Sequence, residues 1–256
     1  MKPIVEIDLL TLGVSLLLLL FPLYIFYRYK ISLIKEMGVS VVRMFVQLLL
    51  VGFYLQWIFD LNNPLVNIVW ITMMLLVGAG TTVQRTGLSF GRFFLPLFVA
   101  NTLTVIVIFV FLRLFVFDRQ TAWDARYMIP IIGMLLGNAL NSSIIGIEKY
   151  LKARKAYRDF FDFVRIQTGR PNLASRPFIR EAIQQTISPL LAGISVTGLI
   201  SLPGMMTGQI LGGSAPTVAI RYQILILVTI FAGTTLILYL SLLAIQYTLN
   251  RRLYKE

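Results

Sequence analysis

The chain has 256 residues, of which 57% are hydrophobic and only 13% are charged. Soluble domains carry about 25% charged residues, so the excess of apolar side chains here must face lipid. The lack of Cys and His excludes disulfides, thiolate or imidazole metal sites and the nucleophile systems that need these side chains, and we expect no cofactor.

Seven apolar segments follow one another, each with about the length needed to cross 30 Å of hydrocarbon. They cover residues 8–27, 38–59, 64–84, 93–116, 127–148, 181–200 and 222–249. Glu6 and Asp8 precede the first segment and no small-residue cleavage site follows it, so we expect a retained helix rather than a signal peptide. The sequence predicts an all-α, polytopic integral membrane protein, with about seven transmembrane helices in one domain, 1–256.

The net charge of +12 lies mainly in alternate loops. Lys and Arg follow the first, third, fifth and seventh segments, whereas loop 60–64 has none and loop 117–126 balances two Asp against two Arg. Because cytoplasmic loops carry an excess of basic residues, the N-terminus should lie outside and the C-terminus in the cytoplasm. This distribution predicts the lipid bilayer as a partner and argues against nucleic acid.

The basic connection 148–180 is the one sizeable cytoplasmic feature. Its first part, EKYLKARKAYRDFFDFVR, interleaves aromatic and charged residues and predicts an amphipathic helix that prolongs the fifth segment. The residues Thr168-Gly-Arg-Pro171 then predict a break. Two interpretations stay open: a helix resting on anionic headgroups, or a docking surface for a cytoplasmic partner.

The fifth segment carries polar and small residues where polarity is costly. Asn138, Asn141 and Glu148 fall on roughly one helical face. Gly133 and Gly137 lie four residues apart, a spacing that lets two helix backbones approach closely. We expect the glycines to pack against a helix, and the two Asn residues either to pack or to line a transport pathway.

The stretch SLPGMMTGQILGG, residues 201–213, predicts a broken helix. Pro203 lacks a backbone donor and clashes with the preceding turn, so the sixth segment should end or kink just before it, with Ser201 or Leu202 capping a new helix. Small residues then recur every fourth position, at Gly204, Gly208 and Gly212, and other faces carry Met205, Met206 and Gln209. Broken helices often line a transport route, although a purely structural kink stays open.

Three stretches resemble one known family. IPIIGMLLGNALNSS (129–143) and TGLISLPGMMTGQILGGSAPTVAIRYQILI (197–226) closely resemble the membrane subunits of a small ABC-transporter family linked to iron export, whose plant relatives are linked to aluminium tolerance. VRMFVQLLLVGFYLQWIF (42–59) resembles the second segment of that family, with Gln47 in the matching place.

The resemblance implies a homodimeric permease of a bacterial inner membrane that exports iron or another metal ion with two copies of a separate ABC ATPase. No G-x-x-x-x-G-K-[ST] loop occurs in the sequence, so another chain must bind ATP and this chain is not expected to be an enzyme. In ABC permeases a short helix docks in a groove of the ATPase, which favours docking by 148–180, although the EAA-type loop motif is not evident. By position, we place docking at Arg165, Gly169, Arg170 and Arg176.

The expected substrate pathway consists of amide, hydroxyl and thioether side chains: Gln47, Asn138, Asn141, Ser201, Met205, Met206 and Gln209. Contact with a metal would fall to Met205, Met206 or Glu148, but thioethers suit Cu(I) better than iron, so a chelated or organic substrate is an alternative. A membrane scaffold or receptor that recruits a soluble partner is a second alternative. An intramembrane enzyme is disfavoured, because the sequence offers no nucleophile–base pair.

Overall fold

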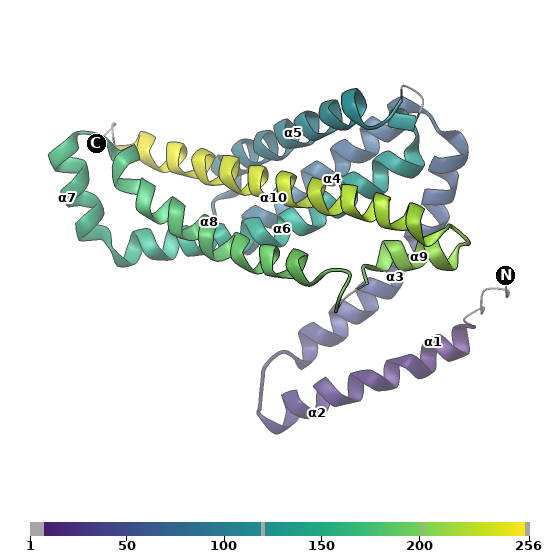
Figure 1. The fold of residues 1–256 in the computed structure, drawn as a ribbon. Helices are drawn as coiled ribbons and strands as arrows, with labels where there is room; N and C mark the ends of the chain where they lie inside the picture. Colours follow the sequence, from purple (N-terminus) through teal and green to yellow (C-terminus); the bar gives the residue numbers. More distant parts are fainter. Residues whose placement is uncertain (1–7, 119–120, 201, 254–256) are drawn as a thin grey trace. The chain divides into compact units, whose positions relative to one another are not determined.

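The computed structural model describes residues 8–118, 121–200 and 202–253, and helices make up most of these ranges (Figure 1). Among the described residues, six helical stretches are long and apolar enough to cross a membrane. They are Leu10–Arg28, Ile34–Leu61, Pro64–Arg85, Phe90–Phe115, Ala125–Ala156 and Pro216–Asn250. The predicted class, an all-α polytopic integral membrane protein, is confirmed.

Contacts divide the chain into two compact units, residues 1–61 with 211–213 and residues 62–210 with 214–256. The first unit contains α1 (Leu9–Ser15), a 3-10 stretch (Leu16–Leu19), α2 (Leu20–Arg28) and α3 (Ile34–Leu61). The three shorter elements follow one another without a break, and Lys30, at φ 52°, lies in the turn that leads to α3. The apolar windows of these helices are 0% buried within the chain, as expected of helices that face lipid.

The second unit is a bundle of five long helices (Figure 1). They are α4 (Pro64–Arg85), α5 (Phe90–Phe115), α6 (Ala125–Ala156), α8 (Pro171–Val196) and α10 (Pro216–Leu253). α6 packs against α4, α8 and α10, and α10 packs against α5, α6 and α8, so these two helices form the centre. Leu135 and Ile147 of α6, with Leu238, Leu242 and Ile245 of α10, are fully buried there.

Local capping fixes where two of these helices begin. The Asn63 side chain accepts a hydrogen bond from the backbone N–H of Leu65 at 2.9 Å, and Asp124 accepts one from Arg126 at 2.9 Å. Each contact satisfies a donor that the first helical turn leaves unpaired. Asn62 also accepts a hydrogen bond from the Ala125 N–H at 3.0 Å, which joins the starts of α4 and α6.

Two glycines bring α6 and α10 together. A methyl group added at Gly146 of α6 would collide with Leu238, and one added at Gly233 of α10 would collide with Leu135. Each helix therefore inserts a leucine into a notch that a glycine opens on its neighbour. Gly146 and Gly233 were not among the glycines that the sequence predicted to pack against a helix. Of the predicted ones, Gly133 lies near α4: a methyl group added there would be 3.2 Å from Met74 Cε.

The predicted break near residues 200–213 is present. The sixth apolar segment belongs to α8, which begins at Pro171 and ends at Val196, and Gly198 then adopts a φ of 88° that only glycine takes easily. The helix therefore ends before residue 200, and this Gly198 turn, rather than Pro203 alone, interrupts it. α9 (Gly204–Leu211) follows Pro203 directly, whereas the expected cap residue Ser201 lies outside the described residues.

The helices and the break expected in the basic connection 148–180 are also present. α6 continues to Ala156, beyond its apolar part, and α7 (Arg158–Thr168) follows after a kink at Tyr157. Gly169 ends α7 in the left-handed conformation at φ 64°, which confirms the expected break. Figure 1 shows α7 across one end of the bundle.

Candidate functional site

The outward surface of α8 is polar over its first five turns. Its inward side is buried through Ala174, Phe178, Ala182 and Ile187. The exposed side carries polar residues at helical spacing: Arg176, Arg180, Glu181, Gln184, Gln185 and Ser188. Because hydrocarbon penalises such side chains, this face must meet water, headgroups or another protein surface.

α6 extends the polar surface beside α8. Lys149 Nζ donates a hydrogen bond to Gln185 Oε1 at 2.8 Å, and Gln185 Nε2 donates to Glu181 Oε1 at 2.8 Å. Glu148 forms an ion pair with Lys152 at 3.1 Å. Polar side chains of the two helices are thus joined directly, and we call this surface the α6–α8 polar face.

The two asparagines of the fifth segment, Asn138 and Asn141, also belong to the α6–α8 polar face. Asn138 and Asn141 are exposed, and by helical periodicity they lie on the side of α6 that carries Glu148 and Lys149. Asn138 Nδ2 donates to the Met134 carbonyl at 2.8 Å, which leaves its amide oxygen free to accept a further bond. Gly137 is exposed beside them, with no described atom within 4 Å of an added methyl group.

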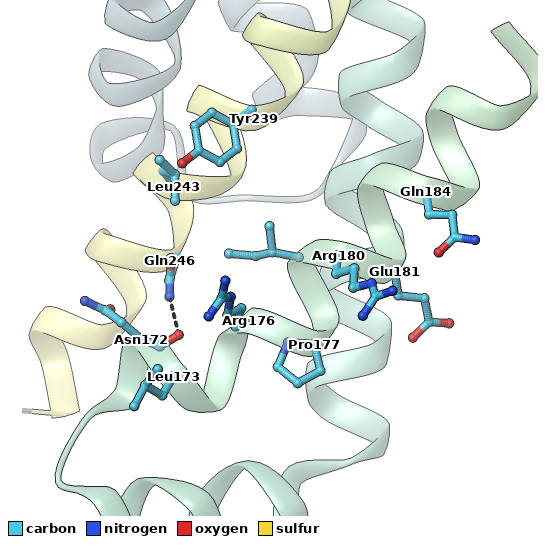
Figure 2. Close-up of a pocket in the computed structure, with 11 residues that line it drawn as sticks. Asn172, Leu173, Arg176, Pro177, Arg180, Glu181, Gln184, Tyr239, Leu243 and Gln246 are labelled. Carbon is cyan, nitrogen blue, oxygen red and sulfur yellow. Dashed lines mark hydrogen bonds between the residues drawn. The ribbon is translucent and has the colours of Figure 1, made fainter. Parts of the chain in front are cut away.

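A groove of about 1100 Å³ lies along the other edge of this surface, between α8 and α10 (Figure 2). Arg176, Arg180 and Glu181 line it from α8, and Tyr239 and Gln246 line it from α10. Neither arginine forms an ion pair with a described residue. The groove thus places two guanidinium groups against one carboxylate, which favours an anion.

A polar network holds one end of the groove in place. Gln246 Nε2 donates to the Asn172 carbonyl at 3.2 Å, the bond drawn in Figure 2. Asn250 Nδ2 donates to Asn172 Oδ1 at 3.1 Å, while Arg154 donates to Asn250 Oδ1 at 3.1 Å. The Arg154 guanidinium also lies 4.3 Å from the centre of the Phe161 ring. Side chains from α6, α7, α8 and α10 are therefore fastened together in the half of α10 near the C-terminus.

α7 presents an apolar surface outward from this network. Phe161 is buried, but Phe160, Phe163 and Ile166 are exposed by 49%, 61% and 74%. Arg165 forms an ion pair with Asp162 at 3.1 Å. We call Phe160, Phe163 and Ile166 the α7 patch.

The predicted docking residues lie at different places. Gly169 and Arg170 are exposed in the turn between α7 and α8, whereas Arg165 is half-buried in its ion pair and Arg176 lines the groove. The α7 patch was missed, although the alternation of Phe with charged residues already indicated an amphipathic helix. The sequence signal for the patch was the recurrence of a large apolar residue at every third position, Phe160, Phe163 and Ile166.

The remaining predicted residues do not gather at one place. Gln47 is exposed on α3 in the first unit. Met205 packs against a core cluster that contains Ile226 and Ile230, while Met206 lines a cavity between α8 and α10. Glu148 is instead paired with Lys152. In the part of the chain that the structure describes, no three carboxylate side chains lie together as a metal site.

Gly204 and Gly208 of the broken segment do not pack against another described helix. An added methyl group at Gly204 or Gly208 would have no described atom within 4 Å. Any close helix contact at this stripe would therefore come from outside the described part of the chain. Gln209 has its side-chain oxygen buried without a hydrogen-bond partner among the described residues.

The UPF0014 family model, described as an uncharacterised protein family, matches residues 9–250. The chain belongs to this family. It is 33% identical over 215 residues to "Protein ALUMINUM SENSITIVE 3" of Arabidopsis thaliana, covering 83% of this chain and 77% of the relative. It is 28% identical over 229 residues to the Bacillus subtilis membrane protein YjkA, covering 90% of each chain.

A third relative carries a functional name. The chain is 25% identical over 253 residues to the "Probable iron export permease protein FetB" of Escherichia coli, covering 96% of this chain and 92% of the relative. No solved structure matches the chain. The family resemblance expected from the sequence is therefore confirmed, and the chain is a member of a membrane permease family.

Proposed function

We propose that this UPF0014 member is the membrane-spanning subunit of an ATP-driven ABC exporter, with iron or another metal ion as its substrate. In this proposal two copies of the chain assemble in a bacterial inner membrane, with the N-terminus outside and the C-terminus in the cytoplasm. Two copies of a separate ATPase bind on the cytoplasmic side and hydrolyse ATP. The name of the Escherichia coli relative supports the substrate class.

The observation that carries the proposal is the α6–α8 polar face. A chain that otherwise presents apolar helices to lipid exposes Arg180, Gln184, Gln185 and Ser188 along one helix. Such side chains are stable inside a membrane only beside a water-filled cavity or a partner. A polar passage completed by the second copy would provide both, and Asn138 and Asn141 would extend it towards the other side.

The α7 patch supports coupling to a soluble ATPase. Three large apolar side chains lie exposed on a short helix, in a segment that the distribution of basic residues places in the cytoplasm. Exposed aromatic residues of this kind are typical of protein interfaces. The network through Arg154 and Asn250 then connects this surface to α8 and α10.

A second candidate substrate class follows from the groove in Figure 2. Arg176 and Arg180 lie there without an ion-pair partner among the described residues, and the volume of about 1100 Å³ suits a small molecule rather than a bare ion. Glu148 is already engaged by Lys152. These observations favour a chelated metal or another organic anion over a free cation as the species that enters from the cytoplasm.

Reconstitution tests the proposal. The chain is co-expressed with the candidate ATPase, and inside-out vesicles receive radioactive iron either as ferrous ion or as ferric citrate, with and without ATP. ATP-dependent uptake of either form supports export, and the preferred form decides between the two substrate classes. A chain that captures no ATPase and gives no ATP-dependent uptake of either form would instead be a scaffold or receptor.

A further inference from the structure

The groove of Figure 2 carries two positive charges that no neighbour neutralises. Arg176 and Arg180 line it one helical turn apart, a spacing that places their Cβ atoms about 5–6 Å from each other. Neither forms an ion pair with a described residue. Because the planar fork of a guanidinium matches the two oxygens of a carboxylate, the pair can hold two carboxylates of one small anion.

The remaining walls suit the body of such an anion. Leu173 and Leu243 contribute apolar surface, and Tyr239 and Gln246 add a phenol and a carboxamide. Small-molecule sites are lined in this way, with a few polar groups set among apolar ones. The volume of about 1100 Å³ accommodates a carboxylate ligand together with a metal ion that it chelates.

One carboxylate opposes the two guanidinium groups. Glu181 lines the groove and also a cleft of about 290 Å³ between α6 and α8, so it lies on the ridge between them. Gln185 Nε2 donates to Glu181 Oε1 at 2.8 Å, which restrains the carboxylate without neutralising it. Lys149, which lines the cleft, donates to Gln185 instead, and Glu181 has no ion-pair partner among the described residues.

These charges distinguish three forms of substrate. A bare metal cation is repelled by the two guanidinium groups. A metal-free tricarboxylate such as citrate carries about three negative charges near neutral pH, and Glu181 repels the charge that two arginines leave over. A trivalent metal bound to the same carboxylates cancels most of this excess, so the loaded chelate loses the repulsion and keeps carboxylate oxygens for the arginines.

We infer that the groove selects the metal-loaded form of a polycarboxylate chelate over both the metal-free chelator and the bare ion. Arg176 and Arg180 bind carboxylate groups of the chelate, and Glu181 disfavours the metal-free form by repulsion, which is how a site gains specificity beyond its attractive contacts. The inference rests on the proposed function, for which it names the form of the substrate. Free polycarboxylates of the cytoplasm would stay in the cell.

Calorimetric binding to the purified full chain in nanodiscs, without ATPase or ATP, tests the inference. The probes are citrate, ferrous ion and chromium(III) citrate, a kinetically inert stand-in for the ferric chelate. We expect chromium(III) citrate to bind about fivefold more tightly than citrate, as for one unfavourable charge interaction near a protein surface. Ferrous ion alone should not bind in the groove.

Three variants and two controls assign the effect to residues. Arg176→Gln and Arg180→Gln should each weaken chromium(III) citrate about tenfold, because a charge-assisted contact is lost. Glu181→Gln should tighten citrate about fivefold and change chromium(III) citrate little, so the preference disappears. Arg92→Gln on α5 and Asp159→Asn on α7 alter exposed charges outside the groove and should change neither affinity.

Several results would overturn the inference: no binding of either citrate form, citrate bound as tightly as its chromium complex, arginine variants that bind normally, or a preference that survives in Glu181→Gln. Failure of the proposed function has a different signature. Selective binding without ATP-dependent iron uptake would refute transport and leave the groove assignment intact, whereas normal uptake of ferric citrate by Arg176→Gln and Arg180→Gln would refute the groove and leave transport intact.

Discussion

Replacing Gly233 by Ala tests the packing of the two central helices. The added methyl group would collide with Leu135 Cδ1 and lie 3.0 Å from Cδ2 and 3.3 Å from Cγ of the same side chain. Leu135 is 0% exposed, so it has no free space into which to move. The substitution therefore forces extra volume into a filled contact.

The expected magnitude is a difference between two effects. Overpacking a core costs about 1–3 kcal/mol, while Ala in place of Gly inside a helix gains about 0.5–1 kcal/mol. Gly233→Ala should therefore lose about 1 kcal/mol of unfolding free energy. Gly133→Ala is the matched control, because its methyl group meets only the flexible end of Met74, at 3.2 Å, and it should be neutral or slightly stabilising.

The assay is reversible unfolding in mixed micelles, with SDS as denaturant and tryptophan fluorescence as the signal. Leu135→Val in the Gly233→Ala background should recover part of the loss, since it removes volume at the collision. Gly233→Ala at least as stable as wild type, or equal to Gly133→Ala, would refute the notch contact between α6 and α10.

Three further changes test other parts of the molecule. Phe163→Asp in the α7 patch should abolish co-purification of the ATPase while the chain still inserts, whereas Ser89→Asp, in a loop on the same side, should leave the complex intact. Asn250→Ala should cost about 1–3 kcal/mol of stability in the same unfolding assay, because Arg154 and Asn172 lose their partner. Cysteines introduced at Val116 and Thr168 should react with an impermeant thiol reagent only from outside and only from the cytoplasm, respectively; the opposite pattern would reverse the topology.

The transmembrane helices could be predicted because their signal is local. Runs of about twenty apolar residues specify a spanning helix whatever its neighbours are, and the first four expected segments match helical stretches to within a few residues. The break after the sixth segment was also visible, because Pro203 acts on its own backbone. Its true position depends on Gly198, which adopts a left-handed φ. Nothing in the sequence distinguishes this glycine from the other glycines of the chain.

The polar surface of α8 could not be predicted from the sequence. Arg176 and Arg180 look like residues of a basic connection, so the sequence pattern places them there and begins the sixth apolar segment at residue 181. Only the burial of Ala174, Phe178 and Ala182 on the opposite side shows that the helix starts earlier and turns its polar side outward. The notches at Gly146 and Gly233 were missed for a similar reason, since each depends on a leucine of a distant helix.

Polar side chains anchor α8 near its start, whereas its other end leads into a turn. Asn172 is clamped to Gln246 and Asn250 near the start of the helix, whereas the far end runs into the Gly198 turn and the broken segment. A helix of 26 residues is about 39 Å long, so a tilt of about 5° at the clamp would displace its free end by roughly 3 Å. A small tilt imposed at the α7 end of α8 would thus be magnified at the Val196 end of the helix. Spin labels at Val196 and Val107 should report this displacement on nucleotide binding, and Asn250→Ala should uncouple it.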